Sequence, residues 1–205
     1  GLPCDTCRLG VLHARSADDL FGHIQFNNIG LVNDLLSHAQ CAQLHRRKWF
    51  SPKNGLKSLT RSLPLCHWPY FTGFASPHLA VAYERKTFEQ LWAAAPETLE
   101  ATCRHRFRSM TDVSQLAARA WRLAQGQFTP AKPLGRPYFP DEVDGVQLAI
   151  NAITRRYFRM ICVNDEDRGF DFERERRRLI AAFETLLPQQ SAFERCAPGQ
   201  KEERP

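Results

Sequence analysis

Long hydrophobic runs are absent from this sequence of 205 residues. No stretch approaches the roughly 18 consecutive apolar residues that a membrane-spanning helix needs, so we do not expect the chain to cross a bilayer. An initiator methionine and a charged-then-apolar signal pattern are also missing at the start. We therefore expect that the natural start was removed or that the sequence is a fragment of a longer protein. Internal repeats and low-complexity blocks are lacking too, and the composition excludes a wholly disordered, collagen-like or coiled-coil protein.

Several catalytic signatures are missing as well. The sequence has no Walker A loop, GxGxxG turn, GxSxG elbow or HExxH helix. Its seven cysteines are scattered and odd in number, which argues against a disulfide framework and favours a reducing compartment. Cys4 and Cys7 form a CxxC motif, but no second pair follows at zinc-ligand spacing, so this pattern favours ordinary small apolar residues over a structural zinc site.

The charge that is present is mainly positive. Lys and Arg number 28 against 22 Asp and Glu, for a formal net charge of +6. This excess suggests anionic partners such as phosphate groups, nucleic acid or an acidic membrane surface. A dispersed, well-solvated basic surface explains the same balance equally well. The densest basic cluster, Arg174 to Arg178, interleaves with glutamates as a solvated helix face would.

The apolar spacing predicts a mostly helical α/β fold with a few short strands. With 43% hydrophobic and 24% charged residues, the chain should bury a real core. Helices are expected over about 18–36, 87–95, 97–105, 113–126, 146–153 and 172–187, and a strand over 158–163. A Pro/Gly connector is expected over 129–141. We expect one segment over residues 1–196, followed by a disordered tail at 197–205.

Residues 64–83 differ from the rest of the chain. Four punctuating residues, Pro64, Pro69, Gly73 and Pro77, interrupt a run that is rich in aromatic side chains. Such a segment cannot be a regular helix. It predicts an ordered loop that is held by its aromatic side chains, and a loop of this length in a compact domain is usually functional.

Four polar groupings are candidates for chemistry. His78, on the aromatic loop, is a candidate general base, or else a histidine that bonds its own loop. The Arg104–Arg108 run before Asp112 is a candidate phosphate clamp at a helix start, or else a structural Arg108–Asp112 pair. Asn164 and Asp165 at a strand end could line a site with a metal, or form a turn. The His23–Asn28 stretch could face a site, or be a surface pair.

The order of these motifs resembles the Stealth proteins, bacterial capsular polysaccharide phosphotransferases related to the catalytic subunit of eukaryotic GlcNAc-1-phosphotransferase. The similarity covers roughly residues 3–195. It rests on Gly22–Asn28, Trp68–Phe74, Pro77–Leu79, Arg85, Pro96, Glu97, Thr102, Arg106–Arg108, Asp112 and Arg159–Asp165. The family's acidic strand-end motif and Asn-Asp-Asp motif are missing, so the chain resembles the C-terminal portion of a larger α/β catalytic domain. Ala80 also stands where the family commonly has proline.

The resemblance implies transfer of a sugar 1-phosphate from a nucleotide sugar to a hydroxyl of a polysaccharide or glycan, in capsule or cell-surface glycan biosynthesis. It implies a divalent metal, Mg²⁺ or Mn²⁺, whose ligands are expected to lie partly outside this chain. The expected location is the cytoplasm, at the inner face of the membrane, with peripheral membrane association and no nucleic-acid partner.

The resemblance also implies roles for individual residues. The catalytic set would be His78, Arg108 and Asp112, with His78 as base or phosphate contact and Asp112 orienting Arg108 or lying near the donor. Substrate and phosphate contacts would come from Arg85, Arg106, Asn27 and Asn164, and Asp165 would lie near the metal. Two other functions stay open: a non-catalytic module that binds phosphosugar or polysaccharide, and a basic nucleic-acid-binding domain.

Overall fold

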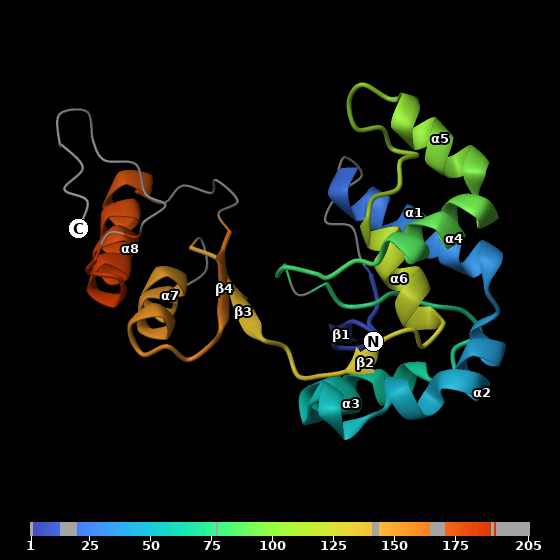
Figure 1. The fold of residues 1–205 in the computed structure, drawn as a ribbon, viewed down its shortest axis with the longest axis horizontal. Helices are drawn as coiled ribbons and strands as arrows, with labels where there is room; N and C mark the ends of the chain where they lie inside the picture. Colours follow the sequence, from blue (N-terminus) through green and yellow to red (C-terminus); the bar gives the residue numbers. More distant parts are fainter. Residues whose placement is uncertain are drawn as a thin grey trace. The chain divides into compact units, whose positions relative to one another are not determined.

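The computed structural model describes residues 2–12, 20–76, 78–140, 144–164, 171–189 and 191. The chain divides into two compact units, Gly1–Pro133 and Leu134–Pro205 (Figure 1). The single segment expected over residues 1–196 stays a prediction, and the expected tail at 197–205 lies outside the described residues. None of the described helices is both long enough and apolar enough to span a membrane.

The first unit is a helical assembly with one small sheet. Its helices are α1 (Leu20–Leu35), α2 (His38–Trp49), α3 (Leu56–Ser62), α4 (Arg85–Ala94), α5 (Pro96–Arg104) and α6 (Leu116–Ala124), and two 3₁₀ turns lie at Pro52–Asn54 and Leu63–Leu65. Strands β1 (Cys4–Asp5) and β2 (Thr129–Pro130) pair in parallel, with Cys4 opposite Thr129. The start of the unit is thereby joined to its end.

Helix α6 lies at the centre of the first unit. It packs against α1, α4 and α2 (Figure 1), and every residue from Ala117 to Ala124 is buried. Small alanines at four of these positions let neighbouring helices approach closely, and Trp121 and Leu123 fill the space between them. Two arginines, Arg119 and Arg122, lie on this otherwise apolar helix and need partners inside the core.

The aromatic loop is ordered by the side chains that the sequence predicted would hold it. Phe71 and Phe74 are buried, and the ring of Phe71 packs edge-on against Trp49 and His38. The Phe71 N–H donates to Asn33 Oδ1 at 2.8 Å, while Asn33 Nδ2 donates to the Phe71 carbonyl at 3.0 Å. The prediction of an irregular but ordered segment is therefore confirmed for the described part of 64–83.

The second unit is a small β-α-β arrangement with one more helix. It comprises β3 (Gly135–Tyr138), α7 (Gly145–Thr154), β4 (Met160–Val163) and α8 (Phe172–Leu186). β3 and β4 pair in parallel from Gly135 opposite Met160 to Tyr138 opposite Val163, and α7 is the crossover that parallel strands require. Tyr138, Ala149 and Ala152 form its buried centre.

The helix-rich α/β class expected from the sequence is confirmed, but some boundaries are wrong. α6 begins at Leu116 instead of Val113, and α4 begins at Arg85, so Thr87 lies inside the helix and does not cap it. The expected connector at 129–141 contains all of β2 and β3. The predicted α8 start is confirmed, since the Asp171 carboxylate accepts from the Arg174 N–H at 3.1 Å. The predicted start of α1 near Asp18 lies outside the described residues.

Candidate functional site

A cavity of about 340 Å³ opens in the first unit. The start of α1, the end of α5 and the segment that leads into α6 form its walls. Twelve residues line it: Phe21, Ile24, Thr102, His105, Arg106, Phe107, Arg108, Asp112, Val113, Ser114, Gln115 and Leu116. The Arg106–Arg108 run and Asp112, singled out from the sequence as a phosphate clamp, therefore lie together in one hollow.

Positive charge dominates the cavity wall. Arg106 and Arg108 are both exposed, and the Arg106 guanidinium lies 5.4 Å from the centre of the Phe107 ring. Asp112 is the one carboxylate among the lining residues, and it is buried at 6% exposure. Ser114, Gln115 and Leu116 lead into α6 at the same wall, where the helix dipole favours an anion, although the N–H groups of Ser114 and Leu116 already donate within the protein. The cavity is suited to a phosphate group.

Asp112 pairs with His105. Its Oδ1 lies 2.6 Å from His105 Nδ1, and its Oδ2 accepts the Ser109 N–H at 2.8 Å. These two hydrogen bonds, the Ser109 one first, lower the pKa of the Asp112 carboxyl below its ordinary value. The structure therefore has Asp112 orienting His105, in place of the Arg108–Asp112 pair that the sequence left open.

Two asparagines of α1 hold the segment that carries Asp112. Asn27 Nδ2 donates to the carbonyls of Met110 and Asp112 at 2.7 and 2.8 Å. The Asn28 amide exchanges two bonds with Ser114, one with its N–H and one with its hydroxyl. The amide N–H groups of Asn27 are engaged within the protein, which gives it a supporting role, and the substrate contact expected of it stays a prediction. Both side chains explain why polar residues interrupt an apolar helix.

His78 lies close to the cavity wall. It is exposed, and its ring centre lies 6.2 Å from that of Phe21, which lines the cavity. Its backbone φ is +47°, in the left-handed region that few residues other than glycine adopt. Such backbone strain concentrates at functional sites. The arrangement is compatible with His78 acting beside the same hollow.

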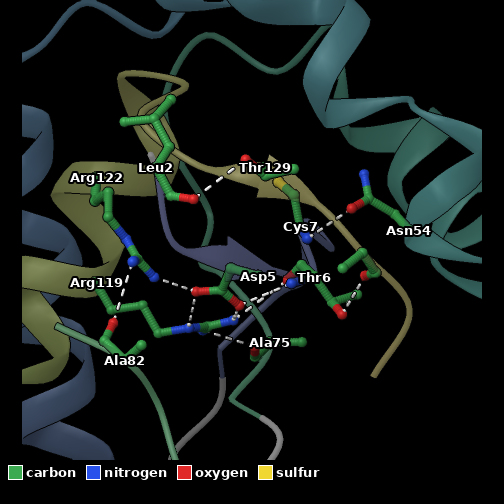
Figure 2. Close-up of polar contacts among 11 residues, drawn as sticks. Leu2, Asp5, Thr6, Cys7, Asn54, Ala75, Ala82, Arg119, Arg122 and Thr129 are labelled. Atoms are coloured by element: carbon green, nitrogen blue, oxygen red, sulfur yellow. Dashed lines mark hydrogen bonds and ion pairs between the residues drawn. The ribbon is translucent and has the colours of Figure 1, made fainter. Parts of the chain in front are cut away.

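A buried cluster holds both flanks of the His78 segment (Figure 2). Arg119 binds the two oxygens of Asp5 at 2.9 and 3.1 Å and donates to the Ala75 carbonyl at 3.0 Å. Arg122 binds Asp5 Oδ2 at 2.5 Å and donates to the Ala82 carbonyl at 3.1 Å. Both arginine side chains are less than 5% exposed. Asp5 thus ties β1 to α6 and, through the arginines, to residues 75 and 82.

Arg85 does not line the cavity, and the structure does not test Asn164 or Asp165 against it. Arg85 lies at the start of α4, 92% exposed and paired with Glu89 at 2.8 Å, and it is not among the lining residues. Asn164 belongs to the second unit, where its N–H donates to the Tyr138 carbonyl at 3.0 Å. Asp165 lies outside the described residues. The substrate and metal roles assigned to these three residues stay predictions.

The described residues do not fit a divalent metal. Within those ranges, no three His, Cys, Asp or Glu side chains come close enough to hold an ion together. The two candidate ligands of the cavity, His105 and Asp112, are bonded to each other. The CxxC motif does not supply a site either, because Cys7 is buried, its N–H donates to Asn54 Oδ1 at 3.1 Å, and burial raises the pKa of its thiol.

Sequence reasoning missed His105 and the buried cluster of Asp5, Arg119 and Arg122. His105 was read only as part of a basic run, since its partner lies seven residues away across a turn that no periodicity reveals. The arginines did leave a signal. Two positive charges three residues apart, on a helix whose other positions are mostly apolar, require a buried counter-charge.

Comparisons with known proteins match the part of the chain that forms most of the cavity wall. Residues 77–116 match the family model for Stealth protein conserved region 3. The chain is 29% identical, over 95% of its length and 56% of the relative's, to the exopolysaccharide phosphotransferase cps2G of Lactiplantibacillus plantarum. It is 30% identical to the capsular polysaccharide phosphotransferase WcwK of Streptococcus pneumoniae and 27% identical to the receptor polysaccharide phosphotransferase WefC of Streptococcus gordonii, each over 84% of this chain and 51% of the relative.

The chain spans about half the length of these curated relatives. No solved structure matches it. The matched region, 77–116, contains His78, Arg106, Arg108 and Asp112.

Proposed function

The chain belongs to the Stealth proteins, and from this premise we propose that it is part of an enzyme that transfers a sugar 1-phosphate from a nucleotide sugar to a hydroxyl of a polysaccharide. The product is a phosphodiester, and the leaving group is a nucleoside monophosphate. In the proposal this reaction serves the synthesis of capsule or another surface glycan. It takes place in the cytoplasm at the inner face of the membrane, with peripheral attachment.

One observation carries the proposal: the cavity in the conserved region is lined by Arg106 and Arg108 and its one carboxylate is bonded to His105. A diphosphate brings negative charge that must be neutralised as the reaction proceeds. Arginine forks suit phosphate oxygens because two N–H groups can bind two oxygens at once. In the proposal, Arg108 and Arg106 hold the phosphates, and His78 beside Phe21 acts as base or phosphate contact.

The proposal includes a divalent metal, Mg²⁺ or Mn²⁺. Because the described residues do not fit one, its ligands would have to come from elsewhere, and no step here is routed through it. The neutralisation of phosphate charge by Arg106 and Arg108 does not depend on it. The binding of donor in the presence and absence of Mg²⁺ therefore separates the contribution of the arginines from that of the ion.

A module that binds phosphosugar without turnover is the second candidate, and the same cavity supports it. Turnover separates the two functions, since only the enzyme releases nucleoside monophosphate. A nucleic-acid-binding domain would instead bind any polyanion with strong salt dependence. A preference for nucleotide sugar over DNA at equal salt separates that function from the first two.

The test is calorimetric titration of UDP-GlcNAc into the purified chain, with and without Mg²⁺. We expect binding that weakens at least tenfold in Arg108→Ala, because a charge-assisted phosphate contact is worth about 1.5–3 kcal/mol. Arg85→Ala is the matched control, since it removes an exposed arginine outside the cavity. Equal binding by wild type and Arg108→Ala would exclude the cavity as the phosphate site.

A further inference from the structure

We propose that His105 is the general base of the transfer reaction and that Asp112 is the residue that positions it. This inference rests on the proposed function, because that reaction needs a group to take the proton from the acceptor hydroxyl. It also assigns different roles to two histidines, His105 and His78. If His105 takes the proton, His78 is left with the other role considered for it, contact with phosphate.

The hydrogen bonds fix which ring nitrogen of His105 can act. An ionised carboxylate only accepts hydrogen bonds, so the 2.6 Å contact to Asp112 Oδ1 places the proton on Nδ1. In the neutral imidazole the other nitrogen, Nε2, keeps its lone pair and can receive a proton. A carboxylate behind one imidazole nitrogen also stabilises the imidazolium that forms, as in hydrolases that use a histidine base.

Asp112 is held firmly enough to orient the ring. Its side chain is 8% exposed, and its second carboxylate oxygen accepts the Ser109 N–H. The backbone carbonyl of Asp112 accepts a hydrogen bond from the Asn27 side chain. Thr102 Oγ1 accepts the N–H of the next residue, Val113, at 3.2 Å. The bonds to α1 and α5 fix the backbone of the segment that carries Asp112, and the Ser109 N–H holds its carboxylate next to His105.

His105 can be reached by substrate. Its side chain is 40% exposed and lines the cavity beside Arg106 and Arg108. The wall contributed by α1, Phe21 and Ile24, is uncharged, and that from α5 is Thr102. The charged groups that face the imidazole from the lining are therefore Asp112, Arg106 and Arg108. A phosphate held by the two arginines would lie next to the base.

The step balances without a redox partner. His105 Nε2 takes the proton of the acceptor hydroxyl, and the hydroxyl oxygen forms a bond to the phosphorus that carries the sugar. The bond from that phosphorus to the bridging oxygen breaks, and its electron pair leaves with the nucleoside monophosphate. The proton on His105 is then released to the leaving phosphate or to water.

The test compares His105→Gln and Asp112→Asn with wild type in the full-length enzyme, because this chain spans about half the length of its relatives. UDP-GlcNAc is the donor and a methyl hexoside supplies the acceptor hydroxyl. We expect both variants to bind UDP-GlcNAc within threefold of wild type. Their rate of UMP release should be lower by a factor of about 100 or more, the usual range for a lost general base or its orienting carboxylate. The wild-type rate should fall at acidic pH, and His105→Gln should lose that dependence. His67→Gln, an exposed histidine outside the cavity, is the matched control.

Two results would overturn the assignment: UMP release by His105→Gln within threefold of wild type, or a loss of UDP-GlcNAc affinity in His105→Gln that accounts for its whole loss of rate. Failure of the proposed function looks different, because wild type would then neither bind UDP-GlcNAc nor release UMP.

A readout that needs no turnover completes the test. Long-range ¹H–¹⁵N spectra of the wild-type chain report which imidazole nitrogen carries the proton. We expect the neutral form of His105 to carry its proton on Nδ1, and Asp112→Asn to disturb that state. A neutral His105 with its proton on Nε2 would refute the proposal, because that nitrogen would have no lone pair to offer.

Discussion

At the scale of single residues, the Asp5 carboxylate faces two guanidinium groups that are almost fully buried. Asp5→Ala would leave both charges in the core without a counter-charge. We expect the free energy of unfolding to fall by about 3–5 kcal/mol, the usual cost of removing one partner from a buried ion pair. Urea denaturation followed by tryptophan fluorescence measures this change, since all four tryptophans lie in the first unit.

Glu89→Ala is the control for that prediction. It removes the partner of Arg85 in an ion pair whose side chains are 92% and 60% exposed, so the expected loss is below about 1 kcal/mol. If both variants lose the same amount, the Asp5 cluster does not stabilise the fold in the way its burial indicates.

Residue chemistry allowed part of the candidate site to be predicted. Arg106, Arg108 and Asp112 lie in one cavity because the sequence that joins α5 to α6 is short and turns back on itself. His78 lies near its wall. The partner of Asp112 could not be predicted, since that choice depends on the turn at 109–112, where the Ser109 N–H and His105 reach the carboxylate together. The role of Asn27 depended on tertiary contacts that periodicity does not encode.

At the scale of elements, replacing a glycine with alanine should have opposite effects on stability at two positions, Gly135 and Gly30. A Cβ at Gly135 would lie 2.1 Å from the Met160 carbonyl oxygen in the neighbouring strand, whereas one at Gly30 in α1 meets no atom within 4 Å. Gly135→Ala should therefore force β3 and β4 apart, at a cost of about 1–3 kcal/mol. Gly30→Ala should stabilise α1 by about 0.5–1 kcal/mol, because alanine loses less backbone entropy than glycine.

Thermal unfolding followed by two probes checks this pair. Far-UV circular dichroism reports both units, and tryptophan fluorescence reports the first alone. Gly135→Ala should lower the temperatures over which part of the circular dichroism signal is lost and leave the fluorescence midpoint unchanged. An unchanged circular dichroism curve for Gly135→Ala would show that this close contact is relieved at no cost.

Most helices were easier to predict than most strands because they are longer, although α2 and α3 were not expected and the four-residue β4 was. α8 and α6 repeat an apolar pattern over two or more turns, so the sequence reveals them even where the end is off by a few residues. β1 and β2 have two residues each and β3 has four, too few for an alternating pattern. β3 also contains Gly135 and Pro137, which indicate a connector when read locally.

At the scale of the whole molecule, the two units differ greatly in the size of their cores. Among the residues that the structure describes, the first unit buries nineteen hydrophobic residues in one cluster and the second buries three in its main cluster. We expect residues 1–133 expressed alone to unfold cooperatively, with the fluorescence midpoint of the full chain. Residues 134–205 alone should show no cooperative transition, because so small a core cannot offset the entropy of ordering the chain. Urea denaturation of both pieces checks this, and a cooperative transition in the second piece would contradict it.

The Asp5 cluster has a mechanical consequence. Strand β1 is short and is held at its edge by pairing with β2, yet its carboxylate fixes Arg119 and Arg122, which in turn grip the carbonyls of Ala75 and Ala82. Displacing β1 would therefore loosen both anchors of the His78 segment at the same moment. A force that pulls on β1 would therefore be transmitted through Asp5, Arg119 and Arg122 to the loop that carries His78.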